Sequence, residues 1–361
     1  MLSTKRLSHI DLLESIAILF VVIYHSVFCF YYKTKTTSET NYILYYSTTI
    51  LSTCVPLFFF ANGYLLFNKE FDLNRHIKRI FRIIILYFIW AFMLMPVYMI
   101  IEGEPLSAST ILFSILNLDI QWDMNFFWFI GALICMYILF PALKALFDNS
   151  KKSFVFFTVA CSIFTFGFVL CNQILSFVSM VTHFDFGRIE YPALTMFNPF
   201  RGTYGYSFVY FCIGGLIHTY EDKILSVKKI KRNVISIIGL FISCMGLFLV
   251  GVYYSKYVDG KIWDVVWNGY DTIFTFFNVL FIYVLCLNYN KNNKFIKNIS
   301  LNTLGIYFTH GLIIRLTRPL IKTQEILYNF PVSIIYAFLI VCVCLLICLL
   351  LRKIPLLKKL I

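Results

Sequence analysis

The stretch HIDLLESIAILFVVIYHSVF, residues 9–28, indicates which class of fold the chain adopts. It is long and apolar enough to cross a bilayer, which takes about 20 such residues. It also carries acids near its start, Asp11 and Glu14, and a histidine deep inside it, His25. An ionisable side chain at that depth is costly unless it faces the interior of a helix bundle or a watery cavity. The stretch therefore predicts a membrane-spanning helix that lines a functional site.

The composition extends this prediction to the whole chain. The 361 residues are 60% hydrophobic and only 14% charged, with a mean hydropathy of +0.79. A soluble domain is about a quarter charged, so this chain is predicted to be an integral membrane protein. The net charge of +13 comes from short basic clusters between apolar runs, so no nucleic-acid partner is expected. The 11 cysteines form no CxxC pair and are predicted to be buried free thiols.

Apolar runs of spanning length can be placed ten times, and we expect the first to be retained rather than cleaved. Together they predict an all-α bundle of about ten transmembrane helices, a single domain over residues 1–361 with no appended soluble domain. The predicted cores are 10–31, 43–67, 80–101, 126–147, 153–172, 205–220, 234–254, 271–289, 300–320 and 332–351.

Lys and Arg concentrate in alternate connecting segments, which orients the bundle. With the N-terminus inside, these segments are cytoplasmic, and an even number of spans places both termini there. The longest outer segment, about 173–204, is rich in aromatic and charged residues. A connection of that length is usually functional or disordered, and its apolar content favours function.

Three titratable residues share one face of the first predicted helix. Residues eleven apart differ by about 20° in azimuth on an ideal helix, and residues fourteen apart by about 40°. Asp11, Glu14 and His25 therefore line up, with Glu14 near the cytoplasmic end and His25 past the midpoint towards the outside. The alternative to a functional role is a neutral His25 that is hydrogen-bonded to a neighbouring helix.

A second pattern lies where the third predicted helix leaves the cytoplasm, in NRHIKRIFRIIILYFIW (74–90). Arg79 and Arg82 share a face, and Lys78 is adjacent. Two guanidiniums on one helical turn suit phosphate, because each binds two oxygens at once. Topology alone also places basic residues at inner helix ends, so both interpretations stay open.

Two later segments carry weaker signals. NTLGIYFTHGLIIRL (302–316) places a second imidazole, His310, near mid-membrane, where a functional and a structural role are equally open. NFFWFIGALICMYILFP (125–141) is punctuated by Trp128 and Pro141, which indicate an interfacial aromatic residue and a helix end.

Together these segments resemble acyltransferase family 3, bacterial integral membrane proteins that modify cell-surface glycans. IDLLESIAILFVVIYH matches the Asp and His of the family's first helix, at Asp11 and His25. CVPLFFFANGYLL resembles the second helix, and Arg79 and Arg82 match the family's Arg-x-x-Arg. FFWFIGALICMYILFP and LGIYFTH resemble its Trp-Phe…Tyr…Pro helix and its late Tyr…His segment. One departure is Glu14, which stands where family members often have Arg, and a carboxylate has the wrong charge to hold phosphate.

The resemblance implies a membrane O-acyltransferase of the bacterial plasma membrane, most often an O-acetyltransferase. Acyl-CoA, such as acetyl-CoA, would arrive from the cytoplasm, with its phosphates on Arg79, Arg82 and Lys78. The acceptor would be a hydroxyl of a lipid-linked or exported glycan, and no metal is expected.

The candidate catalytic residues are His25, Glu14 and His310. His25 suits general-base catalysis, and a covalent acyl-histidine is left open. Asp11 is expected to pair with inner arginines.

The main alternative is a proton-coupled transporter or flippase, in which His25, His310 and Glu14 would relay protons. The sequence shows neither an inverted repeat nor matching broken helices, which are typical of many transporters. A glycan polymerase is a further alternative, but its outer loops would be expected to be richer in Lys and Arg.

Overall fold

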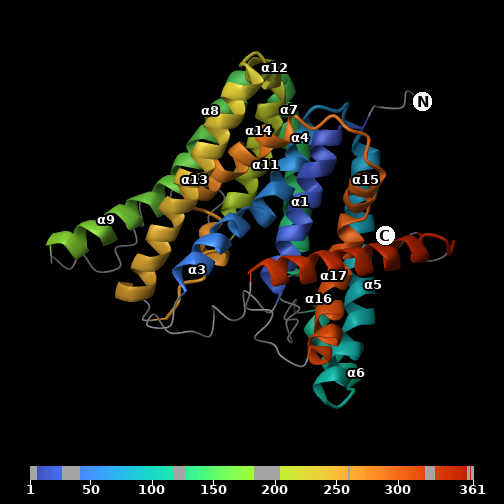
Figure 1. The fold of residues 1–361 in the computed structure, drawn as a ribbon. Helices are drawn as coiled ribbons and strands as arrows, with labels where there is room; N and C mark the ends of the chain where they lie inside the picture. Colours follow the sequence, from blue (N-terminus) through green and yellow to red (C-terminus); the bar gives the residue numbers. More distant parts are fainter. Residues whose placement is uncertain are drawn as a thin grey trace.

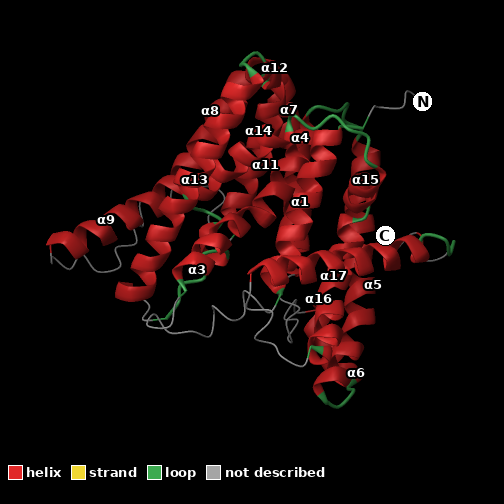
Figure 2. Cartoon of the chain, in the orientation of Figure 1, coloured by secondary structure: helices red, strands yellow, loops and turns green. Residues whose placement is uncertain are grey.

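The computed structural model describes residues 6–26, 41–116, 127–182, 204–258, 261–321, 330–355 and residue 358. Over these residues the chain consists of helices joined by loops, with no β-strand (Figure 2), which confirms the predicted all-α class. The helices are α1 (Ser8–His25), α3 (Tyr42–Thr48), α4 (Cys54–Phe67), α5 (Leu73–Glu102), α6 (Ala108–Leu116), α7 (Trp128–Asn149), α8 (Lys151–Ser162), α9 (Phe168–Thr182), α11 (Gly205–Thr219), α12 (Glu221–Leu225), α13 (Lys229–Tyr253), α14 (Ile273–Cys286), α15 (Lys294–Leu301), α16 (Thr303–Thr317) and α17 (Phe330–Leu351).

Many of these helices are long and apolar enough to cross a membrane. In the described part of the chain, seven stretches meet both criteria: Ser8–His25, Tyr42–Phe67, Leu73–Glu102, Trp128–Asn149, Lys151–Ser179, Lys229–Tyr257 and Pro331–Leu351. The other three predicted runs correspond to α11 and α16, of 15 residues each, and to α14, of 14 residues. The protein is a polytopic membrane bundle, and the number of ten spans stays a prediction, as does the placement of the termini.

The outer helices present apolar side chains on their surface. Phe81 and Ile85 of α5 are exposed, as are Ile238 and Phe241 of α13. The opposite face of α5 is buried and includes Trp90. Soluble proteins rarely expose contiguous apolar surface of this extent, so these faces are suited to contact lipid.

Helix α1 lies in the middle of the bundle (Figure 1) and packs against α4, α14, α15, α16 and α17. Its side chains Ala17, Ile18 and Val22 have no exposed surface. Because α1 is surrounded by protein, its polar residues face neighbouring helices or internal cavities rather than lipid.

Among the described helices, α4 and α11 make the most extensive contact, and two glycines bring them close together. A Cβ atom at Gly63 would lie 1.7 Å from the carbonyl oxygen of Phe211, and one at Gly214 would lie 2.0 Å from that of Phe60. Membrane helices associate closely through such small residues. This explains why the run CVPLFFFANGYLL contains a glycine where the sequence is otherwise bulky.

Hydroxyl side chains interrupt the second predicted span. Between α3 and α4 the chain forms a 3₁₀ turn, η2 (Thr49–Thr53). The hydroxyls of Thr48, Thr49, Ser52 and Thr53 each donate to the carbonyl oxygen three residues earlier, at 2.7–2.8 Å. Such local bonds compete with the α-helical pattern. The span is therefore two helices joined by a turn rather than one straight helix.

Two further boundaries differ from the sequence predictions. The run 300–320 is divided at Asn302, between α15 and α16, where the Asn302 amide donates to the Asn298 carbonyl. Pro141 does not end its helix, because α7 continues to Asn149. Proline inside a membrane helix is tolerated where neighbouring groups compensate for the lost hydrogen bond.

Candidate functional site

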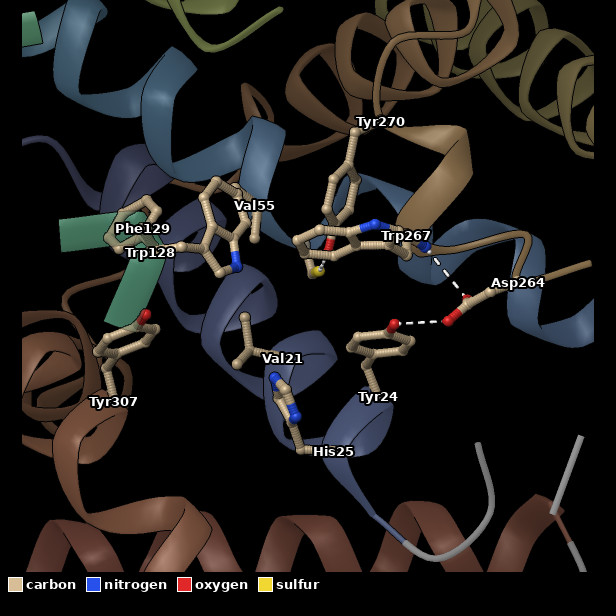
Figure 3. A pocket seen from close by; sticks show the side chains of 11 residues that line it. Val21, Tyr24, His25, Val55, Trp128, Phe129, Asp264, Trp267, Tyr270 and Tyr307 are labelled. Carbon is tan, nitrogen blue, oxygen red and sulfur yellow. Dashed lines mark hydrogen bonds between the residues drawn. The ribbon is translucent and has the colours of Figure 1, made fainter. Parts of the chain in front are cut away.

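The first candidate site is a cavity of about 330 Å³ at the C-terminal end of α1. We call it the His25 cavity. The lining residues that matter for its chemistry are Tyr24, His25, Trp128, Asp264, Trp267 and Tyr270. Figure 3 shows Trp128 and Trp267 on one side of the space and Tyr24 and His25 on the other. The cavity thus combines aromatic walls with a titratable imidazole.

His25 is the last residue of α1 and is exposed. Ser26 leaves the helix with an extended backbone, and its hydroxyl donates to the Ile23 carbonyl and contacts the Ser333 hydroxyl at 3.1 Å. The helix therefore ends earlier than the predicted run 10–31, of which residues 27–31 lie outside the described part. The imidazole sits at a helix end that opens onto a cavity, not within a continuous helix.

The structure brings His25 and His310 together. Their ring centroids are 5.3 Å apart, and His310 has no exposed surface. The His310 Nδ1 atom lies 2.6 Å from the Tyr307 carbonyl oxygen, which only accepts, so Nδ1 carries the proton. The Nε2 atom is then the basic nitrogen of a neutral His310. The two histidines that sequence analysis found in separate runs form one pair.

Asp264 organises the other end of the cavity, and no sequence pattern indicated this residue. Its Oδ2 atom accepts from the Tyr24 hydroxyl at 2.7 Å. Its Oδ1 atom accepts from the backbone N–H groups of Val266 and Trp267, both at 3.2 Å. This carboxylate joins the end of α1 to the loop before α14. Through the bond to the Trp267 backbone N–H it holds the backbone that carries the Trp267 side chain.

A second cavity, of about 540 Å³, lies at the N-terminal end of α1. We call it the Glu14 cavity. The lining residues that carry its charge and hydrogen bonds are Arg6, Asp11, Glu14, Lys69, His218 and Ser300. This cavity is richer in charged groups than the His25 cavity.

Asp11 and Glu14 share one hydrogen-bond network in this cavity. The Arg6 guanidinium pairs with Asp11 at 2.5 Å and donates to the Ser300 hydroxyl at 2.7 Å. Ser300 in turn contacts Asp11 at 3.0 Å and donates to Glu14. Asp11 thus has an arginine partner, Arg6.

Glu14 and His25 do not meet. Eleven residues of α1 separate them, about 16 Å along the axis. The intervening side chains Ala17 and Ile18 of α1 and Leu57 of α4 have no exposed surface. A packed apolar layer therefore separates the two cavities, and the role of Glu14 in catalysis stays a prediction.

Of the residues predicted to bind phosphate, Arg79 acts on a residue of the Glu14 cavity, and none of the three belongs to its described lining. Arg79, Arg82 and Lys78 are exposed on α5. The Arg79 guanidinium lies 5.9 Å from the Tyr137 ring centroid. Burial, followed by the charge of Arg79, lowers the pKa of Lys69, which lines the cavity. Arg79 and Lys69 thus place two cations at one edge of this cavity.

A further polar cluster lies at this end, and no sequence pattern indicated it. The hydroxyls of Tyr64 and Tyr283 both donate to Glu221, the latter at 2.7 Å. His9 lies 3.2 Å from the Tyr64 hydroxyl and 3.9 Å from the Glu221 carboxylate. These residues tie α1, α4, α12 and α14 together, and only their packing in three dimensions makes the cluster visible.

Helices long and apolar enough to cross a membrane, with two cavities among them that hold titratable side chains, define a polytopic membrane protein. The family model described as acyltransferase domain, acyltransferase family 3, matches residues 7–353, so the chain belongs to this family. The protein is therefore a membrane acyltransferase. No curated protein and no solved structure gave a significant match.

Proposed function

We propose that this membrane acyltransferase transfers an acetyl group from acetyl-CoA to a hydroxyl of an envelope glycan. The observation that carries the proposal is the pair of imidazoles, 5.3 Å apart, beside an aromatic cavity. A neutral imidazole is a suitable general base at physiological pH. The acceptor is a lipid-linked or exported glycan, and the enzyme acts in the bacterial plasma membrane.

The proposed reaction starts with a glycan hydroxyl in the His25 cavity. Its oxygen attacks the thioester carbonyl carbon while His25 takes the hydroxyl proton. The C–S bond then breaks, and the CoA sulfur leaves and recovers that proton from His25. His310 donates its Nδ1–H to the Tyr307 carbonyl oxygen. Its ring lies beside the imidazole of His25 and helps to position it.

The charge distribution supports a donor site at the other end of the bundle. Arg79, Arg82 and Lys78 are exposed on α5, and Lys69 lines the adjacent cavity. No Lys or Arg belongs to the described lining of the His25 cavity. The phosphates of CoA are therefore expected to bind at the Glu14 cavity, where these cations lie. The apolar layer around Ala17 and Ile18 must open for the thioester to reach His25.

The proposal is tested with the purified wild-type protein. We expect saturable acetyl-CoA binding by calorimetry, and transfer of labelled acetyl from acetyl-CoA to envelope glycan in membranes. A folded protein that binds no acetyl-CoA contradicts the donor assignment. A protein that binds acetyl-CoA but labels only lipid or protein contradicts the acceptor assignment.

Removal of Arg79 or Arg82 should weaken the binding of acetyl-CoA without weakening that of the acceptor. Arg79→Ala or Arg82→Ala should raise the KM for acetyl-CoA by roughly tenfold or more, because a hydrogen bond to a charged group contributes about 1.5–3 kcal/mol. The acceptor KM should change little in initial-rate measurements. Arg75→Ala is the matched control, because Arg75 is also exposed on α5 but lies beside Asp72, at 3.9 Å. Equal effects of all three variants would show that only overall positive charge matters.

The lowered pKa of Lys69 predicts a proton linked to donor binding. Burial and Arg79 disfavour the charged form, whereas CoA phosphate favours it. Donor binding should therefore take up protons at alkaline pH, and affinity should fall as pH rises through the lowered pKa. Calorimetry in two buffers of different ionisation enthalpy measures this uptake. In Lys69→Arg the uptake should disappear while binding remains, since guanidinium stays protonated; unchanged uptake would assign the proton to another group.

A further inference from the structure

The wall of the His25 cavity opposite the imidazole is an aromatic platform. Trp267 is 40% exposed although it belongs to an aromatic cluster. Its contacts with Trp128 and Tyr270 are edge-to-face, with ring centroids 5.4 Å and 5.9 Å apart. Trp128 is instead stacked on Tyr204, with centroids 4.9 Å apart and planes 8° apart. Trp267 is therefore the indole that extends towards the space above Tyr24 and His25 (Figure 3).

The position of this platform is set by Asp264. One carboxylate oxygen accepts from the Trp267 backbone N–H at 3.2 Å, and the other accepts from the Tyr24 hydroxyl at 2.7 Å. Tyr24 directly precedes His25, and their ring centroids are 5.1 Å apart. Asp264 thereby links the residue that bears the platform to the helix end that bears the base.

The charge of the cavity restricts its ligand. Among the described residues that line it, Asp264 carries a negative charge and none is Lys or Arg. A phosphate or a sugar carboxylate would lie beside the Asp264 carboxylate, and the described lining supplies no Lys or Arg to offset this, which is unfavourable in a partly desolvated site. A neutral ligand avoids this cost.

From these observations we propose that the His25 cavity holds a neutral pyranose ring of the acceptor, stacked on Trp267, with Asp264 as the positioning residue. This rests on the proposed function and specifies its acceptor. A pyranose has an apolar C–H face and a polar rim, which match an indole and the hydroxyl of Tyr24. The volume of about 330 Å³ lies at the lower end of the range for small-ligand pockets, as expected for one ring.

The test uses methyl glycosides as acceptor probes and the wild-type protein in lipid nanodiscs. Nanodiscs are needed because alkyl maltoside detergents carry the very ring under test. Methyl glycosides of glucose, galactose, mannose and N-acetylglucosamine are compared with the methyl glycosides of glucuronic and galacturonic acid. Binding is followed by saturation-transfer NMR, and transfer by labelled acetyl-CoA. We expect at least one neutral glycoside to bind roughly tenfold more tightly than either uronide.

Trp267→Ala should weaken the binding of that glycoside by roughly tenfold, measured as a higher acceptor KM. Acetyl-CoA binding should stay unchanged. The matched control is Trp263→Ala. Trp263 belongs to the same loop but stacks on Tyr254, with centroids 5.4 Å apart, and does not line the cavity. The control should therefore keep the acceptor KM of the wild type.

Asp264→Ala should raise the acceptor KM, because it releases both the Trp267 backbone and Tyr24. Asp264→Asn should restore most of the wild-type KM, since an amide oxygen still accepts from the backbone N–H groups. A catalytic role for the Asp264 charge would leave Asp264→Asn as inactive as Asp264→Ala, with kcat rather than KM affected, and would overturn the positioning role.

The subsite is also overturned if no neutral glycoside binds, if uronides bind as well as neutral rings, or if Trp267→Ala and Trp263→Ala behave alike. These results differ from a failure of the proposed function. That failure would appear as an absence of acetyl-CoA binding or transfer in the wild type.

Discussion

His25→Ala should lower acyl transfer by about 10²- to 10⁴-fold, the range that a positioned general base contributes. Acetyl-CoA binding should stay at the wild-type level, because the cationic groups Lys69 and Arg79 lie at the opposite end of α1. Initial rates with labelled acetyl-CoA and calorimetric binding measure the two quantities on one preparation. The expected result is a protein that binds the donor and does not use it.

Chemical rescue separates a missing base from a distorted site. His25 is exposed at a cavity, so added imidazole has access to the space vacated in His25→Ala. Rescue that saturates with imidazole concentration is expected. His25→Phe is the control, because its ring fills the space and should prevent rescue. If His25→Ala also loses acetyl-CoA binding, His25 belongs to the donor site and the assignment as base is wrong.

The same variant separates direct transfer from an acyl-histidine. Direct transfer leaves no acetyl group on the wild-type protein after incubation with acetyl-CoA alone. A covalent intermediate would add one acetyl group to the peptide that contains His25, seen by mass spectrometry and absent from His25→Ala. The transfer mechanism proposed above predicts an unmodified peptide.

Part of the candidate site could be predicted from sequence, because each imidazole interrupts an apolar run. His25 and His310 stand out singly, since a membrane helix contains few titratable residues. Their separation of 5.3 Å could not be predicted, because it depends on how α1 and α16 pack. Local spacing along one helix says nothing about a partner 285 positions away in the chain.

Other parts of the site carried no local signal. Asp264 lies in an aromatic loop before α14, where an acid is unremarkable, and only its bonds to Tyr24 and Trp267 reveal its position in the cavity. Arg6 stands beside Lys5 near the N-terminus, where positive charge is expected from topology alone. Its contacts with Asp11 and Ser300 depend on the approach of α15 to α1.

The fold was predictable to the level of helices but not to their breaks. Apolar length identifies spans, because a bilayer sets how many apolar residues are needed. The turn η2 and the division at Asn302 arise from side-chain hydrogen bonds to the backbone, which hydropathy does not measure. The shift of the α1 end to His25 has the same kind of cause, at Ser26.

Gly214→Ala should abolish most of the folded protein, measured as the monodisperse fraction after detergent extraction and as retained acetyl-CoA binding. The new Cβ would lie 2.0 Å from the Phe60 carbonyl oxygen and 2.9 Å from the Tyr64 nitrogen, both backbone atoms of α4. Overpacking against side chains that can shift costs about 1–3 kcal/mol. Here the obstacle is the backbone of a helix, so α4 and α11 must separate and the cost is larger.

Gly131→Ala is the matched control for this effect. Gly131 also lies inside a long apolar helix, α7, but a Cβ there meets no atom within 4 Å. Alanine is the better helix former by about 1 kcal/mol, so this variant should be at least as stable as the wild type. Gly63→Ala should behave like Gly214→Ala, because its Cβ would lie 1.7 Å from the Phe211 carbonyl oxygen. If all three variants fold equally well, the close approach of α4 to α11 does not hold the bundle together. If only Gly131→Ala folds, the bundle needs the close approach of α4 to α11. The same approach brings Tyr64 of α4 and His218 of α11 to the Glu14 cavity.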